Sequence, residues 1–548
     1  MKLHPLTFLV WILFLGCKPS TPQLNRWEPY DETSELISNA EHPISRMQYK
    51  RIQSKHTDRN SFFTPFQKDL VEFTQTDHEI LKPLILEQDI PSIQKQVQQG
   101  HLTYEQLTLF YIYRMYRHEL ERSTFLNALI SLNPLVLDQA RKCDKERKEE
   151  LTHPLYGMPI LLKDNIDAVP MATTAGAAVL AQNYPKEDAF IVKQLKNKGA
   201  LILGKVNMSE WAYYFCQGCP LGYSALGGQT LNPYGRKIFE TGGSSSGSGV
   251  AVAANYAVAA IGTETSGSIL SPSGKNSVVG LKPTAGTLSR SGIIPISSSL
   301  DTAGPMTKNV IDNAILMNAL QGEDARDKYS FHSIPVRFNH LDSMRLKGKR
   351  LGLYRNFAED SLMQNAVVKM KNAGANIIVF DPPEVEIDQF RTLLDVDMRS
   401  DLPKYFNTFA NPKLELDSIK DVVAFNLKND TLHAPYGQEI FLGILEEDRS
   451  QVKFEPQKKQ LMQSASTYFQ KIIEKHDLDA LLSIDNNSAR NAAAAHFPAL
   501  GVPMGYTVNG QPKNLTFIAP PQQEQLLLEL GAAFERLSKS RKPPVLFQ

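Results

Sequence analysis

Apolar and polar positions follow two patterns along most of the chain. Compact apolar runs predict β-strands at 158–162, 200–204, 278–281, 350–354, 377–380, 478–484 and 515–518. Between these runs, apolar residues at helical spacing predict helices at 190–198, 250–260 and 522–538. Strands that alternate with helices in this way predict an α/β fold, with a mixed sheet covered by helices.

The N-terminal part of the chain has a weaker pattern. Residues 18–90 begin polar and then gain helical apolar spacing, which indicates a linker followed by a helical extension. The helical pattern strengthens over 93–137, where Thr103 is placed to cap a helix that begins at Tyr104. The extension therefore leads directly into the main domain.

Length and composition fit one large globular enzyme-sized domain. The chain has 548 residues, of which 42% are hydrophobic and 21% are charged. We expect the main domain over 91–548, with the charged, glycine-poor stretch 325–470 forming a flanking or inserted helical lobe. Lys and Arg number 59 against 58 acidic residues, a net charge of +1, so no basic surface argues for a nucleic-acid partner.

The first seventeen residues predict a targeting segment. After Met1 and Lys2, a mostly apolar stretch at 6–15 is too short to span a bilayer but has the length of a signal-peptide core. The sequence 14–17 resembles a bacterial lipobox, in which the cysteine is lipidated. We therefore expect an extracytoplasmic lipoprotein, anchored to the membrane at Cys17 in the periplasm or cell envelope. A secreted soluble protein and an ordinary N-terminal helix are the alternatives.

The other cysteines do not form a metal-binding pattern. Cys216 and Cys219 have no second Cys or His pair at a suitable spacing, so zinc is not expected. An oxidised loop is compatible with an extracytoplasmic compartment. The expectation is nevertheless that Cys216 and Cys219 are unlinked or merely structural thiols.

Two loops rich in glycine and serine, 241–249 and 262–268, carry the strongest chemical signal. They flank a segment that is apolar except at Asn255 and is therefore expected to be buried, unlike a flexible linker. Glycine in such loops allows the backbone to approach another group closely. Successive backbone N–H groups in these turns can bind a negatively charged oxygen.

These loops resemble those of the amidase signature family, and the spacing is specific. Lys163 follows a Gly-Met-Pro strand start at 157–159, Ser244 follows the glycine pair, and Ser268 lies 24 positions after Ser244, as in the family. The segments 207–211, 227–234, 280–284 and 301–306 also fit, and the pattern is most similar to the peptide amidase branch. The resemblance covers about 90–548 and implies helices on both faces of the sheet.

Amide hydrolysis requires a nucleophile, a proton shuttle and donors for an oxyanion. Because no histidine lies near these loops, Lys163 is the plausible base for a serine nucleophile, Ser268. Lys163 must then be neutral near the working pH, and burial at the end of an apolar strand lowers a lysine pKa in that direction. The products would form through an acyl-enzyme.

The resemblance assigns further roles. It implies that Ser244 forms a cis peptide bond with Gly243 and relays the proton between Lys163 and Ser268. Ser245 is expected to hydrogen-bond Lys163. The oxyanion donors are expected to be the backbone N–H groups of Thr265, Ser266, Gly267 and Ser268. No metal, organic cofactor or obligate protein partner is implied, and the substrate is a peptide C-terminal amide or another small amide.

Other interpretations remain. Residues 243–247 match the G-x-S-x-G elbow of α/β-hydrolases, which would make Ser245 the nucleophile with His433 or His496 as its partner. That motif needs a preceding strand, and 235–241 is polar. The glutaminase-like subunit of a tRNA amidotransferase shares the catalytic loops, and a non-catalytic ligand-binding lipoprotein shares the fold.

Three positions depart from the family pattern and bear on specificity. Ser266 stands where the family often has Gly and the peptide amidase branch tends to have Asp. Ser246 replaces a Gly, and Leu270 replaces an Arg that is common in the wider family. Lys163, Ser244 and Ser268 are all retained, which argues against an inactive enzyme.

Overall fold

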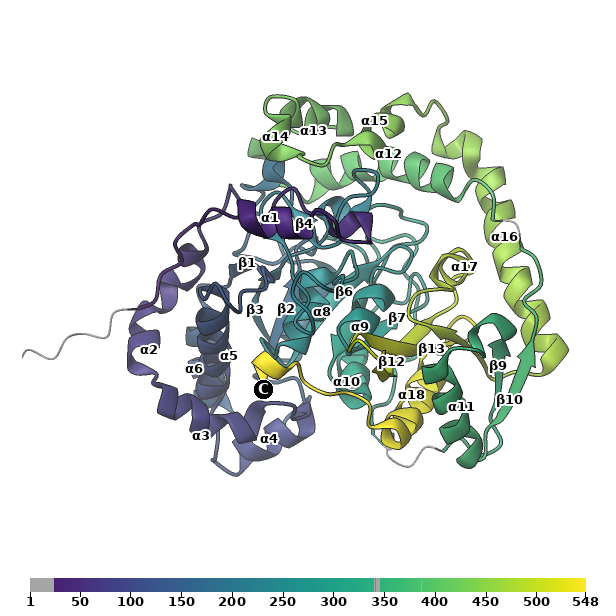
Figure 1. The fold of residues 1–548 in the computed structure, drawn as a ribbon, viewed down its shortest axis with the longest axis horizontal. Coiled ribbons are helices and arrows are strands. Elements are labelled where there is room, and N and C mark those ends of the chain that lie inside the picture. The colour runs from purple at the N-terminus through teal and green to yellow at the C-terminus, as the bar shows by residue number, and fades with distance from the viewer. Residues whose placement is uncertain (1–23, 340, 342–344, 386) are drawn as a thin grey trace, which may run out of the picture.

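A mixed eleven-stranded sheet forms the centre of the described chain. The computed structural model describes residues 24–548 except 340, 342–344 and 386. The strand order is β1-β3-β2-β6-β8-β7-β12-β13-β11-β9-β10 (Figure 1). Their bounds are β1 Leu129–Leu132, β2 Pro159–Lys163, β3 Leu201–Val206, β6 Ala259–Glu264, β7 Val279–Lys282, β8 Thr302–Thr307, β9 Arg350–Tyr354, β10 Asn376–Phe380, β11 Ala480–Ile484, β12 Ala499–Tyr506 and β13 Pro512–Ile518. A small hairpin, β4 Tyr223–Ser224 with β5 Gly228–Gln229, lies apart from this sheet.

The sheet combines parallel and antiparallel pairs. Strand β2 is parallel to both β3 and β6, whereas β6 and β7 pair antiparallel with β8. Parallel neighbours end at the same edge of a sheet, so the ends of β2 and β6 lie together. The two strands thus carry Lys163 and the start of the 262–268 loop to one place.

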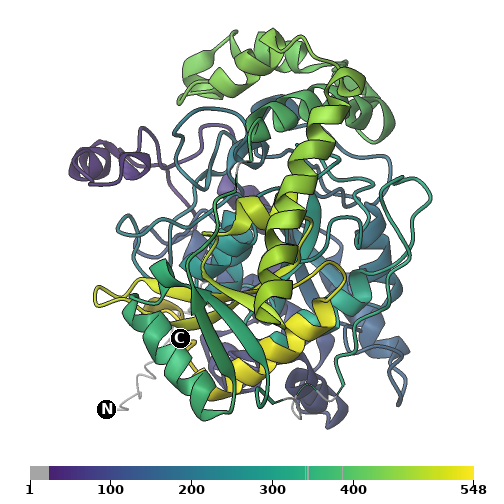
Figure 2. The same ribbon diagram turned by 90° about the vertical axis from the view of Figure 1, so that its right-hand side faces the viewer.

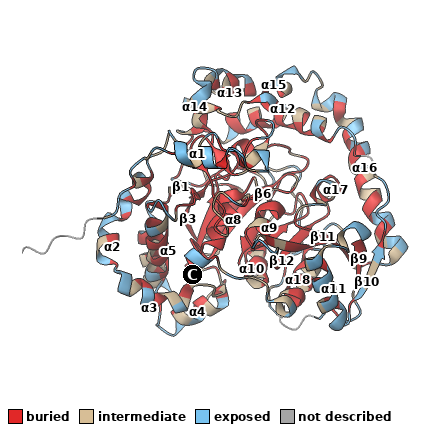
Figure 3. Ribbon diagram, in the orientation of Figure 1, coloured by how far each residue is buried: buried red, intermediate tan, exposed pale blue. Residues whose placement is uncertain are grey.

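Helices cover the sheet in two layers, as expected. In one layer, α8 Ser246–Ala253 contacts β2, β3 and β6, and also contacts α9 Leu270–Lys275. In the other layer, four helices contact one another in sequence and lie on strands of the same sheet: α7 Phe190–Asn197, α10 Val310–Leu320, α18 Glu524–Ser538 and α11 Ser361–Asn372. Every residue of α8 is buried, which confirms that the loops at 241–249 and 262–268 do not flank a solvated linker (Figure 3).

The N-terminal extension is helical. It contains α1 Thr33–Asn39, α2 Gln67–Glu72, α3 Gln75–Ile85 and α4 Ile90–Gln98, followed by α5 Tyr104–Glu119 and α6 Val136–Glu146 of the main domain. In Figure 1, α2 to α6 lie on the left side of the molecule, whereas α1 is drawn nearer the centre. Thr103 caps α5 in a reciprocal capping box with Gln106, so the expected helix start is confirmed.

The segment 325–470 divides into two parts. Strands β9 and β10, both predicted as strands, belong to the sheet and pair in parallel at its end. Apart from α11, which lies in the second helical layer, the remainder forms a helical lobe that rises over one edge of the sheet, with a long helix running down from it (Figures 1 and 2). Its helices are α12 Phe390–Thr408, α13 Ile419–Asn426, α14 Asp430–His433, α15 Glu439–Glu446 and α16 Gln451–His476, and a short helix, α17 Ala489–Ala494, follows β11.

One predicted helix is wrong in its boundaries. The helix expected at 250–260 begins earlier, at Ser246, and ends at Ala253, while Ala259 already belongs to β6. Asn255 takes a left-handed conformation with φ of 57°, which ends the helix and redirects the chain. The helix and the strand after it both consist of small apolar residues, so composition did not show where one ends and the other begins.

Candidate active site

Lys163 ends β2 as a fully buried amine. Its Nζ donates to Ser244 Oγ at 2.8 Å, to Thr263 Oγ1 at 2.8 Å and to the Thr263 carbonyl at 3.0 Å. Burial lowers the pKa of Lys163 to about 7, partly opposed by the charges of Asp301 and Glu264. The amine is therefore available in its neutral form near neutral pH, and it is hydrogen-bonded to a serine hydroxyl.

The two serines after the glycine pair have different contacts. The peptide bond between Gly243 and Ser244 is cis, as the resemblance implied. Ser245 Oγ does not bond Lys163 in the described structure; it donates to the Thr263 carbonyl at 3.0 Å and accepts from the Thr263 N–H at 3.2 Å. Ser245 therefore supports Lys163 through Thr263, and not by the direct bond that was expected.

Ser268 lies in the loop between β6 and α9 and is only partly buried. Its carbonyl accepts the Ser245 N–H at 3.1 Å, which joins the two glycine-rich loops beside Ser244. Within the described residues, the four consecutive N–H groups at 265–268 have no acceptor in the protein. Gly267 has φ of 96°, a conformation that favours glycine. The loop thus presents free N–H donors around a partly exposed hydroxyl.

Two buried carboxylates hold this loop in place. Glu264 Oε2 accepts the N–H groups of Ile269 at 2.7 Å and Leu270 at 3.0 Å, so it fixes the backbone of the loop. Asp301 accepts the Thr265 hydroxyl on one oxygen. Burial raises the pKa of Asp301 to about 6, against the hydrogen bonds that favour its ionised form.

Asp164 and Asn165 order the segment that follows the lysine. Asp164 forms a fully buried ion pair with Lys205, with 3.2 Å between Oδ1 and Nζ. Asn165 Nδ2 donates to Thr263 Oγ1 at 3.0 Å and to the Ile294 carbonyl at 3.3 Å. Asn165 thereby connects the surroundings of Lys163 to the next segment of the site.

A cavity of about 550 Å³ opens beside Thr263 and Thr265. Most of its lining comes from the end of β6, the segment 290–302, and α12 of the helical lobe with Phe409 just after it; single residues or pairs at Asn165, Ala212 and 326–327 complete it. No sequence motif identified its lining in the lobe. Outside the lobe, Thr263 and Thr265 fall in the loop 262–268, and Asp301 and Thr302 fall in the motif 301–306, both of which the sequence had marked.

The hydrolase-elbow interpretation receives no support from the geometry. Ser245 is not preceded by a strand, since 239–245 is irregular. His496 Nε2 contacts the Ser299 carbonyl at 3.0 Å, and burial lowers its pKa to about 4. His433 Nδ1 contacts the Phe425 carbonyl at 3.3 Å, so both imidazoles have partners other than Ser245.

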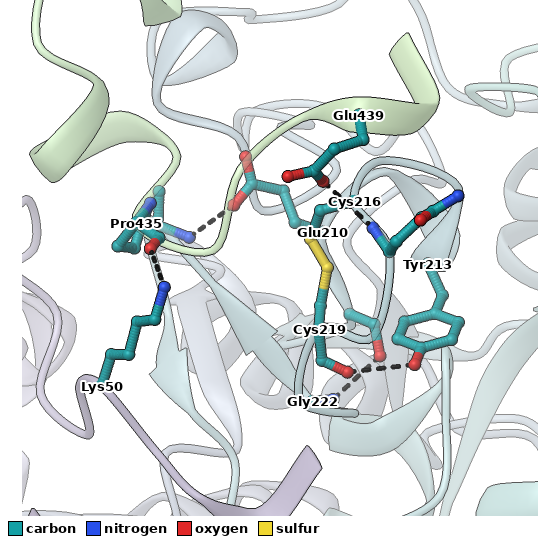
Figure 4. Close-up of a disulfide and its surroundings, with 11 residues drawn as sticks. Lys50, Glu210, Tyr213, Cys216, Cys219, Gly222, Pro435 and Glu439 are labelled. Atoms are coloured by element: carbon teal, nitrogen blue, oxygen red, sulfur yellow. Dashed lines mark hydrogen bonds between the residues drawn. A yellow bond between two sulfur atoms is a disulfide. The ribbon is translucent and has the colours of Figure 1, made fainter. Parts of the chain in front are cut away.

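The expectation of unlinked cysteines is wrong. Cys216 and Cys219 form a disulfide, and their Cα atoms lie 5.9 Å apart, within the usual range for such a bond. Figure 4 shows the disulfide below Glu439, whose carboxylate accepts the Gln217 N–H at 3.2 Å. Tyr213 OH donates to the Cys219 carbonyl at 3.0 Å. The loop therefore links the core to α15 of the lobe.

The described residues contain neither a metal cluster nor a membrane span. No group of three or more His, Cys, Asp or Glu side chains among them is arranged to hold a metal ion. Within the same residues, no helix combines the length and apolarity needed to cross a bilayer. The predicted lipidation site, Cys17, lies outside the described residues.

The family model described as Amidase matches residues 112–483. A probable amidase of Arabidopsis thaliana is 34% identical over 84% of this chain and 92% of its own length. An amidase family protein of Bacillus anthracis superposes with a TM-score of 0.84 at 35% identity, covering 90% of this chain and 100% of the other. A peptide amidase of Stenotrophomonas maltophilia gives 0.78 at 36% identity, covering 84% and 98%.

Proposed function

This chain belongs to the Amidase family and is an amidase, and from that premise we propose that it hydrolyses a carboxamide through an acyl-enzyme on Ser268. The observation that carries the proposal is the bond from the buried Lys163 amine to Ser244 Oγ, 2.8 Å long. A lysine with a pKa of about 7 can accept a proton at neutral pH, which an exposed lysine cannot.

In the proposed reaction, neutral Lys163 takes the proton of Ser244 as Ser244 takes the proton of Ser268. The Ser268 oxygen forms a bond to the amide carbon, giving a tetrahedral oxyanion. The C–N bond then breaks, and the nitrogen leaves as ammonia or an amine after receiving the proton back through Ser244. Water attacks the acyl-enzyme by the same relay and releases the carboxylic acid.

The N–H groups of Thr265, Ser266, Gly267 and Ser268 are the proposed oxyanion donors. Their lack of acceptors among the described residues supports this role, since unpaired N–H groups in a loop are costly unless a ligand or water binds them. Hydrogen bonds to Asp301 and Glu264 hold this loop in place. Removal of one donor of this kind lowers the rate by about 10²–10³-fold in known cases.

The proposed substrate is the C-terminal amide of a peptide or another small amide. The likeness to a peptide amidase supports a peptide amide. The alternatives are the glutaminase-like subunit of a tRNA amidotransferase and a non-catalytic binding protein. Neither is favoured by a specific contact in the site.

Labelling with a fluorophosphonate separates catalysis from simple binding. The wild-type protein is expected to form an adduct on Ser268, and a Ser268→Ala variant is expected to fold normally without an adduct or turnover. A substrate panel of peptide amides, small aliphatic and aromatic amides and esters then identifies the class. Turnover by Ser268→Ala at the wild-type rate would place the nucleophile elsewhere.

We also propose that the protein is an extracytoplasmic lipoprotein anchored through Cys17. The disulfide between Cys216 and Cys219 supports an oxidising compartment, since such bonds rarely persist in a reducing cytosol. Mass spectrometry of the mature N-terminus tests the proposal. A lipid-modified Cys17 is expected, and an unmodified Met1 in a soluble fraction would contradict it.

A further inference from the structure

The cavity of about 550 Å³ borders the loop that carries Ser268. Thr263 and Thr265 line it, and these residues flank Glu264 at the start of that loop. The leaving group of a primary amide is only ammonia, so nearly all of the substrate belongs to the acyl side. An acyl group attached to Ser268 must therefore find room next to this loop, where the cavity lies.

One wall of the cavity is apolar and fixed to the catalytic loops. It is formed by consecutive residues 293–296, with Ile294 and Ile296 each only 4% exposed. The Ile294 N–H donates to the Asn165 carbonyl at 2.9 Å, and the Ile296 N–H donates to Asp301 Oδ2 at 2.8 Å. The same Asp301 binds Thr265, so the apolar wall and the oxyanion loop share one carboxylate.

The charged side chains that line the cavity are already paired with one another or with the protein. Arg290 makes two bonds to Asp327, of 2.7 and 2.9 Å, in a pair whose side chains are 10% and 8% exposed. Lys404 binds Asp401 at 2.9 Å at a more exposed point.

The remaining charges follow the same pattern. Arg326 is paired with Glu187, and it also lies 3.6 Å from Asp324. Asp301 accepts from Thr265 and from the N–H groups of Ile296 and Ser297, the latter two at 2.8 and 2.9 Å. A charged acyl group entering the cavity would therefore lose water without gaining a free counter-charge, and such desolvation is costly.

We propose that this cavity is an acyl pocket that selects amides whose residue next to the scissile bond carries an uncharged, apolar side chain. The proposal rests on the amidase function argued above and narrows its substrate. It also predicts that free glutamine, with a charged carboxylate and a charged ammonium group, is a poor substrate.

Matched N-acetyl amino acid amides test the charge rule. Leucine and aspartate amides have similar shapes, and methionine and lysine amides have similar lengths. We expect kcat/KM for the neutral member of each pair to exceed that for the charged member by about 10²-fold or more. Free glutamine serves as a further substrate and is expected to react more slowly than the leucine amide.

The variant Ile296→Ala tests the wall itself. We expect it to lower the ratio of kcat/KM for N-acetyl-leucinamide to that for N-acetyl-glycinamide by about tenfold, since the apolar contact is removed. Ile484→Ala is the control, because Ile484 is equally buried, at 4%, but lies on β11 away from the cavity. A ratio of two substrates on one enzyme does not depend on how much of a variant is folded.

The outcomes are distinguishable. Charged and neutral amides hydrolysed at similar rates, a preference for free glutamine, or an unchanged ratio in Ile296→Ala would overturn the acyl-pocket proposal while leaving the amidase function intact. Absence of both fluorophosphonate labelling and hydrolysis of any amide would overturn the proposed function, and the acyl pocket with it.

Discussion

Two buried lysines on neighbouring strands show how their partners determine their roles. Strands β2 and β3 run in parallel, with Lys163 beside Val206 and Leu162 beside Lys205. Burial lowers the pKa of both lysines. Lys205 lies 3.2 Å from the Asp164 carboxylate, which favours its charged form, whereas Lys163 is bonded only to hydroxyls and a carbonyl. Lys205 therefore forms a structural ion pair, whereas Lys163 is an amine suited to accept a proton.

Replacement of the proposed base should give the largest effect. Lys163→Met is expected to lower kcat by about 10⁴-fold or more, because serine nucleophiles depend on their base to this degree. Its free energy of unfolding should fall by about 1–3 kcal/mol, since three hydrogen bonds of the amine are lost. Steady-state kinetics and urea unfolding measure the two quantities. Retention of a tenth of the activity would remove Lys163 from the mechanism.

The same substitution at the neighbouring lysine should have the opposite profile. Lys205→Met leaves the Asp164 carboxylate buried without its cation, and breaking such a pair costs about 3–5 kcal/mol. The kcat per active site, titrated with fluorophosphonate, is expected to stay close to wild type. A stable Lys205→Met protein that has lost turnover would show that the two lysines share one function.

The pH profile should report the neutral amine directly. Because Lys163 must be unprotonated, kcat/KM is expected to fall below its pKa of about 7, by about tenfold for each further unit of pH. Below about pH 6, protonation of Asp301 should steepen the fall, since Asp301 loses an acceptor for the oxyanion loop. A profile that stays flat from pH 8 to pH 5 would contradict a lysine base.

The support of Lys163 through Thr263 predicts a smaller effect. Ser245→Ala removes the hydroxyl that bonds the Thr263 N–H and carbonyl, but leaves all three bonds of the Lys163 amine. A loss of these two hydrogen bonds, about 1–2 kcal/mol, corresponds to a kcat lower by about fivefold to thirtyfold. Kinetics of Ser245→Ala beside Ser244→Ala measure the difference. Equal losses in the two variants would indicate that Ser245 acts on Lys163 directly.

The sequence predicted the central fold better than the lobe that covers it. The strands that end at Lys163, Tyr354 and Ile484 were identified, because a strand buried on both faces is a compact apolar run in the sequence. Strand β12 was not identified, since Gly501, Pro503 and Gly505 interrupt its apolar pattern. Its buried place between β7 and β13 comes from pairing with residues distant in the chain.

The candidate site could be predicted as far as it depends on motifs and spacing along the chain. The spacing of Lys163, Ser244 and Ser268 along the chain was enough to indicate a serine amidase. The direct bond expected from Ser245 to Lys163 is absent from the described contacts because Thr263, on β6, lies between them. The contacts of Asp301 could not be predicted, because they depend on loops that meet only in the folded chain.

The sequence by itself determined the family, the chemical groups and the loops that carry them, since these depend on residue type and spacing along the chain. The tertiary structure decided which lysine lies without a carboxylate, which cysteines are joined, and which residues line the cavity beside Thr263 and Thr265. These properties depend on burial and on partners from distant parts of the chain. The pKa of Lys163 follows from both: the sequence places a lysine at the end of an apolar strand, and the fold buries it and lowers its pKa to about 7.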